Sequence, residues 1–157
     1  MRIGIIGLGT VGRAIRDGFE SAHEIFIHDK DLETAISDVT DNAEVAYIAV
    51  PTPGIDGSGA CDTGVVEDVL DELPAGFSAI IKSTVIPGTT QRLHDSYPDL
   101  KIACSPEFLR SATSVDDFKR QDILVVGTHH EDLAEIVLSN HQEAGVFSGE
   151  AFFHVSP

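Results

Sequence analysis

Gly7-Leu8-Gly9-Thr10-Val11-Gly12 lies directly behind the apolar run Ile3-Gly4-Ile5-Ile6 and in front of a helix-like stretch. Glycines at this spacing between a strand and a helix are typical of a dinucleotide-binding turn. Gly7 would allow the tight turn, Gly9 would let the backbone approach a pyrophosphate, and Gly12 would let the helix pack against the strand. The motif therefore predicts the first strand-turn-helix unit of a parallel α/β sheet.

The helix after this turn is expected to begin near Val11. Its first N–H groups have no partner within the helix and lie at the positive end of the helix dipole. Such N–H groups bind phosphates. Thr10 and Val11 are therefore predicted, together with the three glycines, to contact the dinucleotide.

A second apolar run, Ile25-Phe26-Ile27, ends in His28-Asp29, so that an acidic residue falls 17 positions after Gly12. A carboxylate at about this distance accepts hydrogen bonds from the adenosine ribose and repels a 2′-phosphate, which favours NAD over NADP. The neighbouring Lys30 weakens that preference slightly. Asp29 could also be a simple turn residue after a strand.

Length and charge limit the classes of protein to which the chain can belong. It has 157 residues and a formal net charge of −16, which suits one globular domain and opposes binding to nucleic acid or to anionic lipid. No apolar stretch approaches the about 20 residues of a membrane helix, and no secretory signal is recognisable. Cys61 and Cys104 are too few for a disulfide framework. We expect a cytoplasmic protein with neither a nucleic-acid nor a membrane partner.

Strand-like and helix-like segments alternate along the chain, which predicts an α/β fold with a mainly parallel, doubly wound sheet. The expected strands are Ile3–Ile6, Ile25–Ile27, Val45–Val50, Ala79–Ile81, Ile102–Ala103 and Ile123–Val126. The expected helices are Val11–Ser21, Leu32–Ile36, Gly64–Leu73, Thr89–Ser96 and Asp132–Leu138. Asp31 and Thr63 are predicted to cap the second and third helices, Pro87-Gly88 introduces the fourth, and Gly54–Gly59 is expected to be a flexible loop.

Unusual residues follow three of the expected strands, at the edge where parallel α/β sheets bind ligands. These segments are Val50-Pro51-Thr52-Pro53, the stretch Lys82–Thr89 that contains Ser83-Thr84, and Ser105-Pro106-Glu107-Phe108-Leu109-Arg110. Taken in order with the glycine motif, they resemble the N-terminal half of the UDP-glucose/GDP-mannose dehydrogenase family. The resemblance runs from Met1 to about Gly127.

The resemblance implies a Rossmann-type NAD-binding domain over residues 1–127. Residues 128–157 would be a C-terminal helix/strand extension of the same domain that ends before the family's central helix. Enzymes of this family oxidise the C6 alcohol of UDP-glucose or GDP-mannose to a carboxylate with two NAD molecules, and a later domain supplies a cysteine nucleophile. We therefore expect a catalytically incomplete part of an oxidoreductase. It would share a nucleotide-sugar substrate with a missing C-terminal domain and could form a homodimer in its full-length form.

The resemblance also assigns roles to particular residues. Thr84 and Glu107 would face the nicotinamide and the sugar C6, where they position or activate a water molecule. Further cofactor contacts would come from Val50, Pro51, Thr52 and Ser83. Further substrate contacts would come from Phe108, Leu109 and Arg110. The chain departs from the family at Ser111-Ala112, where Glu-Gly is common, and at Thr10, where an aromatic residue is frequent.

Structural interpretations compete with these roles. Thr84 could cap a turn, Glu107 could be a solvated loop acid, and Arg110 could form a surface salt bridge instead of meeting a phosphate. Lys82 is interpreted as a surface lysine at a strand end, and Cys104 as an inert core residue. The seven histidines lack metal-ligand spacing, so no metal site is predicted.

Two other functions are consistent with a dinucleotide-binding turn. A β-hydroxyacid dehydrogenase would combine it with a similar Ser-Thr-containing segment, but its later glycine-rich substrate motif is not found. A non-catalytic dinucleotide sensor would need no second domain.

Overall fold

Strands and helices alternate in the computed structural model, which describes residues 1–57 and 59–157. The elements are β1 (Arg2–Ile6), α1 (Thr10–Phe19), β2 (Glu24–His28), α2 (Ile36–Thr40), β3 (Val45–Ile48), α3 (Gly64–Asp71), β4 (Ser78–Ile81), α4 (Thr89–Ser96), β5 (Lys101–Cys104), the 3₁₀ turn η1 (Ser111–Thr113), α5 (Ser114–Phe118), β6 (Gln121–Gly127), α6 (Glu131–Glu143) and β7 (Phe147–Val155).

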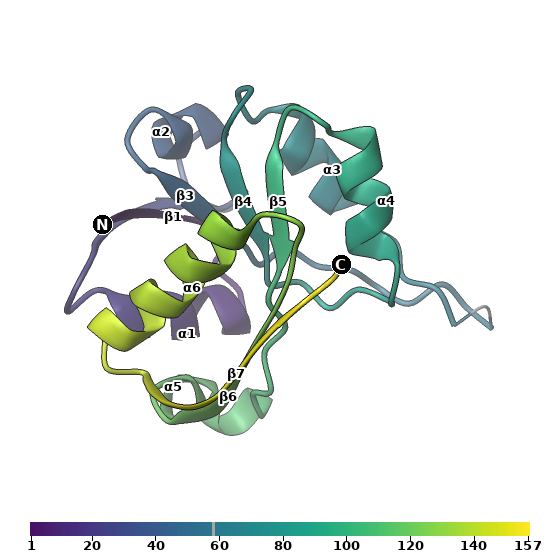
Figure 1. Ribbon diagram of the computed structural model, residues 1–157. Helices are drawn as coiled ribbons and strands as arrows, with labels where there is room; N and C mark the ends of the chain where they lie inside the picture. Colours follow the sequence, from purple (N-terminus) through teal and green to yellow (C-terminus); the bar gives the residue numbers. More distant parts are fainter. Residues whose placement is uncertain (58) are drawn as a thin grey trace.

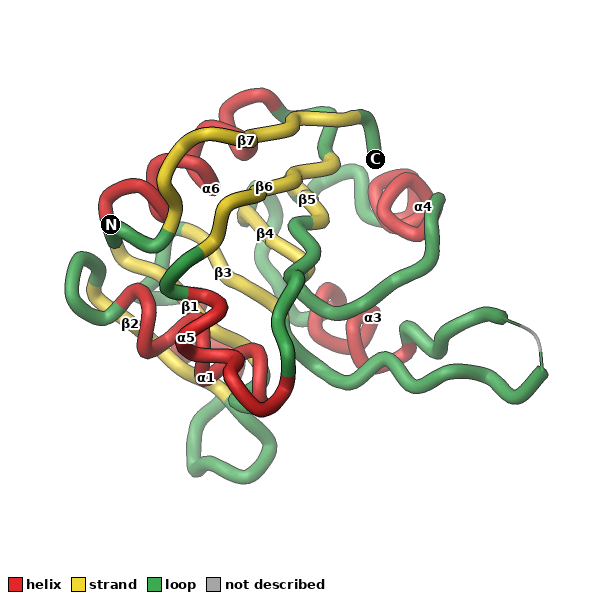
Figure 2. Tube along the Cα trace, turned by 90° about the horizontal axis from the view of Figure 1, so that it is seen from below, coloured by secondary structure: helices red, strands yellow, loops and turns green. Residues whose placement is uncertain are grey.

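The strands among these residues form one seven-stranded sheet in the order β2-β1-β3-β4-β5-β6-β7. The first five strands in this order are parallel to one another. β6 then runs antiparallel to β5, and β7 runs parallel to β6. Figure 2 shows the sheet crossing the molecule between its helices. The prediction of a mainly parallel, doubly wound α/β fold is confirmed.

Alternation along the strands divides the apolar residues between two cores. Ile3 and Ile5 of β1 point to the core that is covered by α1, α5 and α6. Ile6 points to the opposite core, which is covered by α2, α3 and α4. Figure 1 shows these two groups of helices on either side of the sheet. Strands buried on both faces explain why their sequences are nearly continuous apolar runs.

The order of the strands reverses at β1. The chain passes from β1 to β2 on one side and then returns to place β3 on the other side, so that Ile5 lies between Ile27 and Tyr47. Parallel α/β sheets bind ligands in the crevice beyond the carboxyl ends of strands at such a reversal. The glycine turn Gly7–Gly12 directly follows β1 and therefore lies at this crevice.

The second predicted helix is wrong in its position. Residues 32–34 are not helical, and α2 begins only at Ile36. Asp31 is not its cap, because the residue before α2 is Ala35, whose N–H donates to Oδ2 of Asp38 over 2.8 Å. The N–H of Asp31 instead donates to Asp29.

The other predicted elements agree with the structure within a few residues at most ends. Thr63 does precede α3, but its hydroxyl donates to Glu67 and forms no capping hydrogen bond. α6 extends to Glu143, and β7 lies within the predicted helix/strand extension, for which no strand bounds are predicted. α5 is absent from the predicted helices. Ser58, in the predicted loop Gly54–Gly59, lies outside the described residues. Among the described helices, none has the length and apolar character that crossing a bilayer requires.

Candidate cofactor and active site

The three motif glycines meet three different steric conditions. Gly7 has a φ of 94°, and a Cβ on it would lie 2.6 Å from the carbonyl oxygen of Ala49. A Cβ on Gly12 would lie 1.9 Å from the carbonyl oxygen of Gly7. A Cβ on Gly9 would meet no atom within 4 Å. Gly7 and Gly12 are therefore required by the turn and by packing, whereas Gly9 leaves open space in front of the backbone.

The N-terminus of α1 opens onto that space. The helix begins at Thr10, and Gly9 provides no side-chain cap. No acidic residue stands in the first turn. Thr10 is exposed and Val11 is half-buried. The first amides of the helix thus keep their positive partial charge, and they suit an anion such as a pyrophosphate.

Asp29 is fixed at the tip of β2 by two backbone amides. Its Oδ2 accepts a hydrogen bond from Leu8 N–H over 2.6 Å, and its Oδ1 accepts one from Asp31 N–H over 3.0 Å. These bonds, the one from Leu8 above all, lower the pKa of the carboxyl group below its ordinary value. Asp29 is therefore an ionised acceptor, held against the glycine turn, with lone pairs left for a further donor.

A cavity of about 490 Å³ connects these groups. The described residues that line it come from the glycine turn, the end of β2, the end of β3 and α3: Ile6, Gly7, Leu8, Gly9, Arg13, His28, Asp29, Lys30, Asp31, Leu32, Ala49, Val50, Pro51, Val65 and Val69. Its volume is in the usual range for small-molecule sites. Apolar walls from Val65, Val69 and Pro51 suit a flat aromatic base, and Asp29 is the acidic acceptor beside them.

The segments after β3 and β4 are joined by side-chain hydrogen bonds to the main chain. The Thr52 hydroxyl donates to the carbonyl oxygen of Thr84 over 2.6 Å, and the Ser83 hydroxyl donates to that of Val50 over 2.7 Å. The side chain of Thr84 is exposed at the carboxyl edge of the sheet. Thr52 and Ser83 therefore shape this edge, and Thr84 lies on it.

Glu107 lies beyond β5, at the same edge of the sheet. It is half-buried, and its Oε2 is buried with no hydrogen-bond partner among the described residues. Cys104 belongs to β5 itself, and burial raises the pKa of its thiol, which disfavours the thiolate that a nucleophile needs. The geometry places Glu107 near the ends of β4 and β5 but provides no activated cysteine there.

Lys82 is not the surface residue that the sequence predicts. Its side chain is fully buried at the end of β4, with Nζ 3.4 Å from the carbonyl oxygen of Pro106. Burial lowers its pKa to about 8, although the charges of Glu107 and Cys104 oppose this change. The available signal was its position: it directly continues the apolar strand Ala79–Ile81 in a sheet that is covered on both faces.

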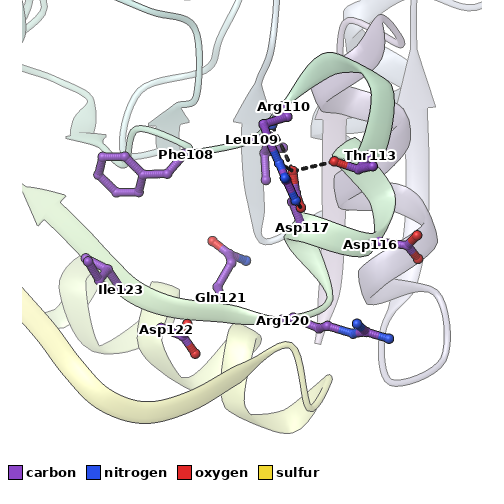
Figure 3. A pocket seen from close by; sticks show the side chains of 10 residues that line it. All are labelled: Phe108, Leu109, Arg110, Thr113, Asp116, Asp117, Arg120, Gln121, Asp122 and Ile123. Carbon is purple, nitrogen blue, oxygen red and sulfur yellow. Dashed lines mark hydrogen bonds and ion pairs between the residues drawn. The ribbon is translucent and has the colours of Figure 1, made fainter.

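The predicted substrate residues Phe108, Leu109 and Arg110 line a second cavity of about 630 Å³ with α5 and the start of β6, shown in Figure 3. Arg110 Nη2 and Nε donate to Asp117 over 2.7 and 3.1 Å, and Thr113 Oγ1 also donates to it. The Arg110 guanidinium holds the pKa of Asp117 well below its usual range. Of the two interpretations of Arg110, the salt bridge is present. Phe108 is 63% exposed and open to a ligand or partner.

No cluster of three potential metal ligands is found in residues 1–57 and 59–157. The rings of His94, His129 and His130 do lie together, with centroids 5.0 and 5.4 Å from that of His94. They gather between α4 and the start of α6, away from the cavity beside Asp29.

Solved structures that share this fold include several sugar-nucleotide dehydrogenases. A UDP-glucose dehydrogenase from Pyrobaculum islandicum superposes with a TM-score of 0.81 at 22% identity, over 99% of this chain and 46% of its own. A GDP-mannose dehydrogenase from Pseudomonas aeruginosa gives 0.78 at 22% identity, with the same coverage. A 3-hydroxyisobutyrate dehydrogenase from Mycobacterium tuberculosis gives 0.70 at 16% identity. Likeness at these identities shows the fold alone.

Sequence relatives are more specific. A UDP-glucose 6-dehydrogenase from Rhizobium meliloti is 35% identical over 65% of this chain and 25% of its own length. One from Haloferax volcanii is 29% identical over 92% of this chain and 46% of its own. The chain thus spans less than half the length of these relatives.

The family model described as "UDP-glucose/GDP-mannose dehydrogenase family, NAD binding domain" matches residues 27–144. The matched range is most of the chain, and it begins after the glycine turn. The steric evidence from Gly7, Gly9 and Gly12 is therefore independent of it. The chain belongs to the UDP-glucose/GDP-mannose dehydrogenase family and carries its NAD binding domain.

Proposed function

We propose that this chain binds NAD as part of a nucleotide-sugar 6-dehydrogenase that acts on a UDP-glucose- or GDP-mannose-type substrate. The observation that carries the proposal is the Leu8–Asp29 hydrogen bond of 2.6 Å. It places an ionised acceptor beside a turn whose Gly9 leaves space for a phosphate. A diphosphate and a ribose are thereby offered complementary groups within one cavity.

Each part of the cavity has its own task in this proposal. The amides at the start of α1, from Gly9 to Val11, hold the diphosphate. Asp29 accepts hydrogen bonds from the adenosine ribose and repels a 2′-phosphate, with the exposed Lys30 next to it. Val50 and Pro51 pack against the cofactor from the end of β3, and Thr52 and Ser83 fix the loops beneath it.

Thr84 and Glu107 carry the proton chemistry in this proposal, beside the nicotinamide and the sugar C6. Bound NAD would accept a hydride from the C6 carbon of the sugar. The Glu107 carboxylate, half-buried beyond β5, can accept a proton from a water molecule, and the Thr84 hydroxyl can hold that water in place. Phe108, Leu109 and Arg110 would contact the substrate from the second cavity, where Arg110 already neutralises Asp117.

The chain alone would bind NAD without turning over substrate. Of its two cysteines, Cys104 has a raised thiol pKa and Cys61 lies in the loop after β3. We propose that the covalent step depends on a cysteine-bearing domain outside this chain, with which the substrate is shared and through which a cytoplasmic full-length form would dimerise. Without such a partner the chain would act as a dinucleotide-binding module.

Isothermal titration calorimetry of the 157-residue chain with NAD tests the proposal. We expect saturable binding of one NAD per chain, and no NADH formation when UDP-glucose or GDP-mannose is added. Absence of binding at millimolar NAD would contradict the proposed function. Turnover by this chain alone would contradict the proposed division of labour.

A further inference from the structure

A buried polar cluster lies where β4 and β5 end. Ile81 pairs with Cys104 in the sheet, and Ser105 N–H donates to the carbonyl oxygen of Ile81 over 2.9 Å. Lys82 and Ser105 therefore adjoin each other directly beyond the paired strands. Both residues have no exposed surface. Glu107 follows two residues after Ser105, with Oε2 buried.

The hydrogen bonding in this cluster is incomplete. An ammonium group has three donors, and the bond found for Lys82 Nζ is a long one of 3.4 Å to the carbonyl oxygen of Pro106. Ser105 Oγ and Glu107 Oε2 are buried without a hydrogen-bond partner among the described residues. A buried charge is costly unless an opposite charge compensates it. Glu107 is the carboxylate whose charge favours the cationic form of Lys82.

We propose that Lys82 is a positioning residue for Glu107: its buried ammonium, 3.4 Å from the carbonyl oxygen of the preceding Pro106, supplies the positive charge toward which the carboxylate is oriented at the ends of β4 and β5. The proposal rests on the proposed function, because it is there that Glu107 needs to accept a proton. A general base has to face the proton that it accepts, and a nearby buried cation attracts and orients a carboxylate. An apolar side chain could fill the same space without burying a charge. A lysine at this position therefore points to function rather than to stability.

Two other titratable groups act on Lys82 or respond to it. The Cys104 thiol of β5 favours the ammonium when ionised, but burial raises its pKa and keeps it neutral. The His141 ring of α6 is influenced by the charge of Lys82, and its pKa is lowered to about 3, mainly by burial. Near neutral pH both groups are uncharged, so Glu107 is the partner that decides the charge of Lys82.

NMR titration of the lysine ¹³Cε signals in the labelled chain tests this pair. The Lys82→Met variant assigns the Lys82 signal, whose midpoint in the wild type is expected near pH 8. Glu107→Gln should lower that midpoint by on the order of 1 pH unit, because it removes a nearby opposite charge. Glu107→Asp retains the charge and should recover most of the shift. Glu72→Gln, at the exposed end of α3, is the matched control and should leave the midpoint unchanged.

An unchanged Lys82 midpoint in folded Glu107→Gln would overturn the proposal. Glu107→Ala provides a second neutral variant if Glu107→Gln does not fold, and it is judged by the same criterion. Calorimetry with NAD on the same samples separates the two proposals. NAD binding without a Lys82 shift overturns the role of Lys82 alone. A Lys82 shift without NAD binding supports the pair and overturns the proposed function.

Discussion

The main-chain N–H of Leu8 donates a hydrogen bond of 2.6 Å to Oδ2 of Asp29 and so ties the glycine turn after β1 to the end of β2. These residues are 21 positions apart in the sequence, but β1 and β2 are neighbouring parallel strands. One carboxylate thereby orders the turn that would hold a diphosphate and faces the cavity that would hold the adenosine.

Replacing Asp29 with Ala should weaken NAD binding by about 10- to 100-fold, because charge-assisted hydrogen bonds to the ribose would be lost. Calorimetry of both chains measures this change. Glu33→Ala, in the same connection and exposed, is the control and should bind NAD like the wild type. Equal NAD affinity in Asp29→Ala and wild type would remove Asp29 from the cofactor site.

Gly9→Ala should weaken NAD binding, whereas Gly12→Ala should lower the stability of the fold. A Cβ on Gly9 meets no atom, so we expect a fold of unchanged stability and at least about 10-fold weaker NAD binding, because the methyl group would occupy the phosphate space. A Cβ on Gly12 would overlap the Gly7 carbonyl oxygen, so we expect a loss of roughly 2 kcal/mol or more. Thermal denaturation and calorimetry measure the two effects. A destabilised Gly9→Ala or a fully stable Gly12→Ala would contradict this division.

The structure also explains which parts of the fold were predictable. The sheet was recognisable because short, nearly continuous apolar runs are what strands buried on both faces require, as in β1 and β3. The position of α2 was not predictable from the sequence. Asp31 has the sequence signature of a helix cap, but in the structure its N–H donates to the Asp29 carboxylate in a turn before the helix. The bounds of β7 were also hard to predict. This strand lies at the edge of the sheet and contains Gly149 at a φ of 87°, which interrupts its apolar pattern.

The candidate site was predictable to a similar extent. Spacing alone selected Gly7, Gly9, Gly12 and Asp29, because a turn and a strand end impose local conditions that a sequence displays. The burial of Lys82 could have been inferred from its place directly after Ala79–Ile81, whereas the Arg110–Asp117 pair depends on how the loop after β5 meets α5, which adjacent residues do not reveal. The substrate contacts of Glu107, Phe108, Leu109 and Arg110 stay predictions.

Lys82→Met should stabilise the folded chain at pH 7. Burial lowers the Lys82 pKa from 10.5 to about 8, so the folded state disfavours the charged form that the unfolded chain adopts freely. The free-energy cost of burying the charged lysine is fully present below pH 8 and disappears as the pH rises through 10.5. At pH 7 its removal is worth roughly 3 kcal/mol. Urea denaturation at pH 7 and at pH 10.5 measures this difference. A Met variant that is equally stabilised at both pH values would contradict the charge-based explanation.

His141 should make the fold sensitive to mild acid. Its ring is buried against Phe19, Tyr47 and Phe118, and its folded-state pKa is about 3, below the ordinary 6.5. As the pH falls, the unfolded state therefore binds this proton before the folded state does. The stability that depends on a neutral His141 ring is fully present above pH 6.5 and is lost as the pH falls toward 3.

Denaturation midpoints of the wild type and His141→Phe between pH 7.5 and 5 check this expectation. The wild type should lose about 1.4 kcal/mol per pH unit more than the variant below pH 6. His129→Phe, whose ring is exposed, is the control and should follow the wild type. Parallel pH profiles for the wild type and His141→Phe would show that His141 does not titrate on unfolding.

A crystal structure of the chain with NAD tests the central claim most directly. We expect the diphosphate within hydrogen-bond distance, about 2.7 to 3.2 Å, of the amides between Gly9 and Val11, and both adenosine ribose hydroxyls facing Asp29. The nicotinamide should extend toward Thr84 and Glu107. NAD bound away from the glycine turn, or with its adenosine ribose turned from Asp29, would contradict the assignment.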